Sequence, residues 1–69
     1  MMGLNHMMDQ LDLDRRIEDA LETARIFEKE SDDCFAKGDV LRGSRLLRYY
    51  ILSLRHAEQL AERRTKAAA

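Results

Sequence analysis

The chain has 69 residues, a net charge of −1 and no proline. This length allows one small domain, which buries only about 60% of the surface of its unfolded chain. With 36% charged and 45% hydrophobic residues, the composition is too apolar for a disordered tail and is typical of a helical bundle. Because Cys34 is the only cysteine, an intramolecular disulfide is excluded, and the thiol is interpreted as a small core residue.

Neither a secretion signal nor a membrane span is visible in the sequence. The first eight residues have no basic region followed by an apolar run. No stretch approaches the roughly 18 apolar residues of a spanning helix. These features predict a cytoplasmic protein with no membrane partner.

Residues 1–11 are expected to form a flexible tail before a first helix over residues 12–37. In that helix, apolar or small side chains recur every three or four residues, which predicts one buried helical face. These positions are Leu13, Ile17, Ala20, Leu21, Ala24, Phe27, Ser31, Cys34 and Phe35. Asp9, Asp12 or Asp14 is a candidate cap for the start of the helix.

The stretch Lys37-Gly38-Asp39 predicts a tight turn between two helices. Gly38 suits the left-handed conformation that closes a helix, and Asp39 suits the cap of the next one. A connection this short makes the two helices antiparallel.

The second helix is expected over residues 40–64, with residues 65–69 frayed. Its expected apolar face is Val40, Ser44, Leu47, Tyr50, Ile51, Leu54, Ala57, Leu60 and Ala61. Leu46, Tyr49 and Leu52 widen this face beyond what one partner helix can cover. The predicted fold is therefore an all-α, antiparallel two-helix hairpin that forms a four-helix bundle as a homodimer or with a helical partner protein. The expected interface consists of Phe27, Phe35, Leu46, Leu47, Tyr50, Ile51 and Leu54.

Charge is distributed unevenly along the chain. Residues 1–38 carry ten acids and five bases, a net −5, whereas residues 39–69 carry three acids and seven bases, a net +4. The favoured interpretation is attraction between the two halves of the hairpin. The alternative is an anionic partner, nucleic acid included, bound by Arg42, Arg45, Arg48 and Arg55 of the second helix, here called the arginine face.

The sequence offers no cluster for catalysis or for binding a metal or cofactor. His6 and His56 are far apart in the chain, and neither C-x-x-C nor H-E-x-x-H occurs. Ser44 and Ser53 have no evident base beside them, and no phosphate-binding glycine loop is present. The expectation is a protein that is not an enzyme and takes no cofactor or small-molecule substrate.

The stretch 34–41, with its K-G-D turn, and the later Tyr49, Ala57 and Leu60 resemble the helical hairpins of tetratricopeptide-like repeats. They also resemble short archaeal domains of unknown function in which a K-G-D turn precedes a tyrosine-containing helix. This similarity covers residues 24–60 and implies a hairpin. A tetratricopeptide array is not expected, because only one hairpin fits the chain.

Two further similarities concern function. The chain resembles nucleotidyltransferase-associated helical domains, but the R-x(4–6)-H motif of their RNase members is missing, since Arg48 and Arg55 do not stand at that distance from His56. In length and fold it is also similar to the two-helix co-chaperones of type III secretion. The sequence thus predicts a non-enzymatic protein–protein assembly module, with a nucleic-acid accessory protein or a secretion-type co-chaperone as alternatives.

Overall fold

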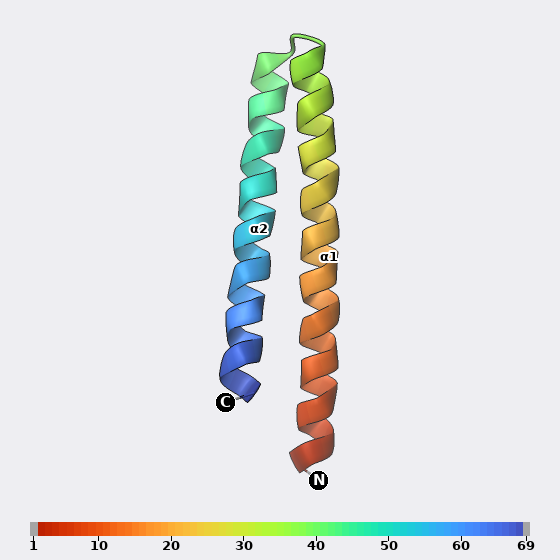
Figure 1. The fold of residues 1–69 in the computed structure, drawn as a ribbon, viewed down its shortest axis with the longest axis vertical. Coiled ribbons are helices and arrows are strands. Elements are labelled where there is room, and N and C mark those ends of the chain that lie inside the picture. Colours follow the sequence, from red (N-terminus) through yellow and green to blue (C-terminus); the bar gives the residue numbers. More distant parts are fainter. Residues whose placement is uncertain (1, 69) are drawn as a thin grey trace.

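The computed structural model describes the backbone of residues 2–68 and the side chains of residues 10–66. Two helices, α1 (Met2–Ala36) and α2 (Val40–Ala68), lie side by side and antiparallel (Figure 1). They form a rod of 56 × 15 × 11 Å. The predicted all-α hairpin, with its turn at residues 37–39, is confirmed.

Both helices are longer than the sequence patterns indicated. α1 begins at Met2 rather than near residue 12, and α2 continues to Ala68 rather than ending near residue 64. The segment predicted as a tail is therefore helical from residue 2, and the segment predicted as a frayed end is helical to residue 68. Residues 1 and 69 lie outside the described part. The reason is that neither segment contains a proline or another strong stop signal. Asp12 and Asp14, considered as caps, stand well inside α1.

The turn closes one helix and starts the next with a single residue in the left-handed conformation. Gly38 has φ of +83°. Its N–H donates to the carbonyl of Phe35 at 3.0 Å, and the N–H of Asp39 donates to the carbonyl of Cys34 at 2.8 Å, which is the Schellman arrangement. The Asp39 carboxylate then accepts from the N–H of Arg42 at 3.2 Å and caps α2.

The contact between the helices, here called the seam, follows alternating steps of three and four residues. On α1 the buried and half-buried positions from residue 17 onward are Ile17, Ala20, Ala24, Phe27, Ser31 and Cys34. On α2 they include Gly43, Leu46, Tyr50, Ser53, Ala57 and Leu60. This is the spacing of an antiparallel coiled coil, but most of its fully buried members are small residues. Cys34 is half-buried on this face, which agrees with its interpretation as a core residue.

The helices approach closely near the turn, where Ser31 meets Gly43. The Ser31 side chain is almost completely buried, at 1% exposure, and its hydroxyl donates to the Gly43 carbonyl at 2.8 Å. The Phe35 ring covers the same glycine, and a Cβ at position 43 would lie 2.9 Å from two of its ring carbons. Glycine inside a helix costs about 1 kcal/mol of stability relative to alanine. Position 43 nevertheless suits glycine, because the Phe35 ring occupies the space that a side chain would need.

The face of α2 that packs against α1 lies beside the predicted apolar face. Tyr50, Ala57 and Leu60 belong to both, but the seam also runs through Gly43 and Ser53, which were not predicted, and through Leu46, which was predicted only to widen the face. The predicted positions Val40, Leu47 and Ile51 are exposed. The predicted apolar face of α2 therefore combines part of the seam with exposed residues that α1 does not cover.

Replacing Gly38 by alanine is expected to destabilise the fold by about 1–2 kcal/mol, because a Cβ is unfavourable in the left-handed conformation. The new methyl group would meet no atom within 4 Å, so the cost comes from the backbone alone. Chemical denaturation of Gly38→Ala and of a Lys37→Ala control measures it. A more stable Gly38→Ala protein would contradict the turn and favour one continuous helix.

Gly43→Ala is expected to have different effects in two backgrounds. With Phe35 present, the gain in helix propensity is offset because the ring must move away from the new methyl group. With Phe35→Ala already in place, the same change should stabilise the protein by about 1 kcal/mol. A double-mutant cycle of denaturation free energies measures the difference. Equal effects in both backgrounds would show that the ring does not restrict position 43.

Candidate functional site

A second apolar line runs along α2 next to the seam. We call it the outer stripe; its members are Val40, Ser44, Leu47, Ile51, Leu54, Glu58 and Ala61. They follow one another in alternating steps of four and three residues, the spacing of a helix-packing surface. The large side chains Val40, Leu47 and Ile51 are 63%, 40% and 43% exposed. α2 thus has two neighbouring packing surfaces, of which α1 covers one.

α1 contributes side chains to the same side of the hairpin. Asp14, Leu21, Glu28 and Phe35 lie seven residues apart and therefore follow one line along α1. Asp14 forms an ion pair with Arg64 of α2, Phe35 covers Gly43, and Glu28 lies close to Tyr50. Leu21 and Phe35 remain partly exposed. The outer stripe and this line of α1 together form one broad surface.

A polar pair bridges the helices within this surface. The Glu28 carboxylate lies close enough to the Tyr50 hydroxyl to favour its protonated form and to repel its ionised form, and both effects, with some desolvation, raise the pKa of Tyr50. The pair places a charged group of α1 beside a polar group of α2 within this surface.

The residues predicted as an interface divide into two groups in the structure. Phe27, Leu46, Tyr50 and Leu54 are half-buried, and the Phe27 ring lies 5.5 Å from the Tyr49 ring, centre to centre. Phe35, Leu47 and Ile51 are exposed. The first group is used at least partly within the hairpin, and the second is available to a partner.

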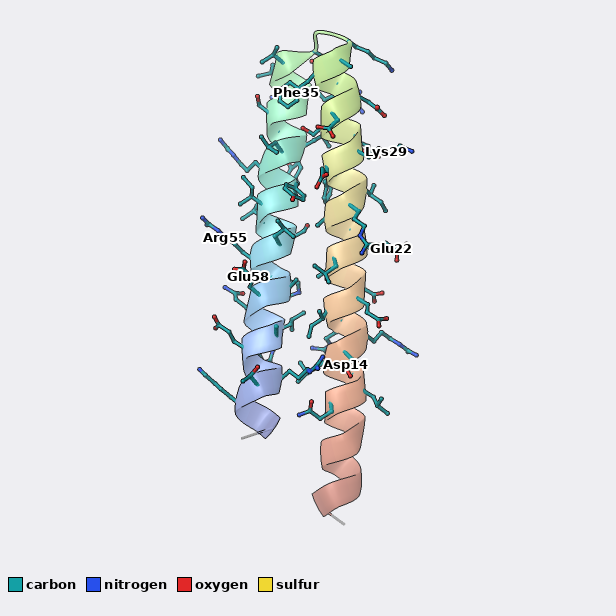
Figure 2. The ribbon with its side chains drawn as sticks, in the orientation of Figure 1. Asp14, Glu22, Lys29, Phe35, Arg55 and Glu58 are labelled. Atoms are coloured by element: carbon teal, nitrogen blue, oxygen red, sulfur yellow. The ribbon has the colours of Figure 1, made fainter. Side chains whose placement is uncertain are left out.

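All members of the arginine face are exposed. Figure 2 shows Arg55 directed away from α1 on the outer side of α2. Among the side chains of residues 10–66, none of Arg42, Arg45, Arg48 and Arg55 forms an ion pair. The ion pair that joins the helices within this range is Arg64–Asp14, at 2.6 Å. The expected electrostatic attraction between the two halves is therefore limited to this ion pair among the described side chains. Most arginines of α2 face solvent.

The opposite side of the hairpin has an open groove of about 440 Å³, which the sequence analysis did not anticipate. Phe27, Tyr49 and Leu52 form its apolar part, and Ser53 and His56 add polar groups. In this part of the chain no hydrogen bond connects the histidine to the serine hydroxyl. The groove therefore brings a nucleophile and a base to one surface without the geometry that activates a nucleophile.

The described side chains include no group of three or more histidine, cysteine, aspartate or glutamate residues arranged to hold a metal ion. His6, the second histidine of the sequence, lies outside the described side chains. Neither helix, over the residues described, has the length and apolar character of a membrane-spanning segment.

Comparison with family models, with curated proteins and with solved structures gives no match for this chain. The resemblance of its turn to tetratricopeptide-like and archaeal hairpins stays a prediction. The surface of the hairpin itself is therefore the feature that indicates a function.

Replacing Glu28 by glutamine should lower the pKa of Tyr50 toward its ordinary value, because the charged acceptor is lost. Titrating the tyrosinate absorbance in a Tyr49→Phe background isolates Tyr50. The raised pKa also means that the folded state holds the tyrosine proton more tightly than the unfolded chain. The corresponding stability is present at neutral pH and is lost as the pH rises through the pKa of the folded state. An unchanged pKa in Glu28→Gln would contradict the contact.

Proposed function

We propose that this protein is a non-enzymatic assembly module that forms a homodimer through the outer stripe of α2. The observation that carries the proposal is a second line of apolar side chains with helix-packing spacing, next to a seam that is already occupied. Contiguous apolar surface of this kind marks interaction sites in soluble proteins. The expected product is a four-helix bundle.

The exposed area of the hairpin supports a partner. The chain exposes 5833 Å², whereas a compact monomer of 8.1 kDa exposes about 4,500 Å². The excess of about 1,300 Å² per chain is larger than the roughly 800 Å² that each partner buries in a typical stable complex. Association along the length of the rod would remove this excess.

The small interior also supports a partner. Among the side chains of residues 10–66, the fully buried apolar ones are Ala20, Ala24, Ala57 and Leu60, and three of these four have only a methyl group to bury. Fully burying a leucine contributes about 1.5–3 kcal/mol, and a methyl group much less. Domains of this size need an additional source of stability, such as a disulfide, a metal or a second chain. With one cysteine in the sequence, a second chain is the source that the apolar surface favours.

Sedimentation equilibrium at micromolar concentration should give twice the chain mass of 8.1 kDa. The double substitution Leu47→Glu and Ile51→Glu should shift the protein toward monomer, because it places charges in the outer stripe. Leu41→Glu is the matched control, since Leu41 is 70% exposed and lies outside the stripe. It should leave the mass unchanged.

A wild-type protein that is folded and monomeric would overturn the homodimer. In that case the stripe would serve a different helical protein, as in a secretion-type co-chaperone. Equal loss of mass in Leu41→Glu and in the double variant would show that the outer stripe is not the specific contact.

A second candidate function is binding of nucleic acid by the arginine face. It is favoured by the exposure of Arg42, Arg45, Arg48 and Arg55, none of which has a carboxylate within 4.0 Å among the described side chains. Arginines along a helix can contact successive phosphates, and such binding weakens steeply as salt rises. Fluorescence anisotropy with labelled RNA and duplex DNA tests it. No binding at about 50 mM salt would reject this candidate.

A further inference from the structure

We infer that the partner on the outer stripe is helix α1 of a second copy, antiparallel to α2, so that the turns of both copies lie at the same end of the bundle. This inference rests on the proposed dimer and specifies its arrangement. It is carried by the opposite charges of the two helices and by the register between them.

The two helices carry large and opposite net charges. α1 has ten acids and four bases, a net −6, and α2 has two acids and seven bases, a net +5. Within one copy, the described side chains form a single ion pair between the helices. Glu22 and Lys29 of α1 and Arg55 and Glu58 of α2 are directed away from the space between the helices (Figure 2). Most of the opposite charge is therefore available to a neighbour.

Two hairpins can stack face to face around a two-fold axis in two simple ways. An axis parallel to the helices places α2 of each copy on α1 of the other, and both turns at one end. An axis across the helices places α2 on α2 and α1 on α1, with the turns at opposite ends. The first arrangement brings a +5 helix against a −6 helix, whereas the second brings like charges together.

The register of the hairpin agrees with the first arrangement. The Phe27–Tyr49 ring contact defines which residues of α1 and α2 lie at the same height along the helix axes, here called level. A two-fold axis parallel to the helices preserves these levels between copies. Counting from this contact, Arg48 is level with Glu28 of the second copy, and Arg55 is level with its Leu21, beside Glu22.

The remaining positions fit the same register. Arg25 of the second copy is level with the uncharged Ile51, and its Leu21 is next to the level of Leu54. The like-charged levels are Glu58 with Glu18 and Glu62 with Asp14. Arginines thus come near carboxylates, and an apolar residue of α1 comes near the centre of the outer stripe.

The first experiment uses sedimentation to measure the dissociation constant of the dimer at several NaCl concentrations and in variants with reversed side-chain charges. The inferred arrangement predicts that the dissociation constant rises with NaCl, because attraction between copies is screened. It also predicts that Arg48→Glu with Arg55→Glu weakens the dimer about tenfold, and that Glu58→Arg tightens it. Stacking of like helices predicts the opposite sign for salt and for the arginine reversal, and those signs would overturn the inference.

The second experiment measures the distance between the two turns. In a Cys34→Ser background, Lys37→Cys provides one spin-label site per copy, exposed and at the turn. If the turns lie at the same end, pulsed electron paramagnetic resonance should give a distance between the two spin labels below about 30 Å. Opposite ends should give more than about 40 Å, given the length of a 29-residue helix at 1.5 Å per residue.

Arg63→Cys in the same background is the matched control at the other end of α2, and it should also give a short distance. A dimer with long distances at both sites would overturn the inferred arrangement and leave the proposed dimer intact. A folded monomer, in contrast, would overturn the proposed function and the inference together.

Discussion

The close approach of the two helices at Ser31 and Gly43 determines how the rest of the side chains are distributed. A hydroxyl from one helix reaches a backbone carbonyl of the other at 2.8 Å, which is possible because position 43 has no side chain. Small residues continue the seam at Ala20, Ala24 and Ala57. Where the seam residues are small, the backbones come together and leave little room for large side chains. Several large side chains of α2, such as Leu47 and Ile51, therefore lie beside the seam.

This distribution explains why the surface of α2 is so apolar. Leu47 and Ile51 follow a helix-packing spacing, as the seam does, yet they stand one position away from it and remain exposed. A protein with a large interior would bury such residues against a third element, and this chain of 69 residues has two helices over its described length. In the proposed dimer, a helix from another chain provides the missing element. The proposed assembly therefore follows from the same packing that holds the hairpin together.

The turn was predictable from the sequence because its chemistry is local. Gly38 and Asp39 act through hydrogen bonds to residues within five positions of them, so their types alone indicate a helix end and a helix start. The buried face of α1 was also predictable, since most of its members recur at helical spacing. The start of α1 was not, because several aspartates qualified as caps and no residue forced a break.

The packed face of α2 could not be predicted from hydrophobicity. Periodicity indicates which residues share a face, but two adjacent faces of α2 satisfy it, and the predicted face combined members of both. The face that meets α1 contains Gly43 and Ser53, whose small size lets the two helices pack closely. The signal that identifies them is steric and involves Phe35 and Ser31 of the other helix, so it appears only when the two helices are placed together. The pair formed by Glu28 and Tyr50 is non-local for the same reason.

In the proposed dimer, the hairpin reaches its stability by covering the outer stripe with a second copy. Thermal unfolding as a function of protein concentration tests this most directly, because dissociation accompanies unfolding of a dimer and makes the midpoint concentration-dependent. The account predicts a melting temperature that rises steadily as the concentration increases from micromolar to near-millimolar values. A cooperative transition whose midpoint is the same at every concentration would contradict it.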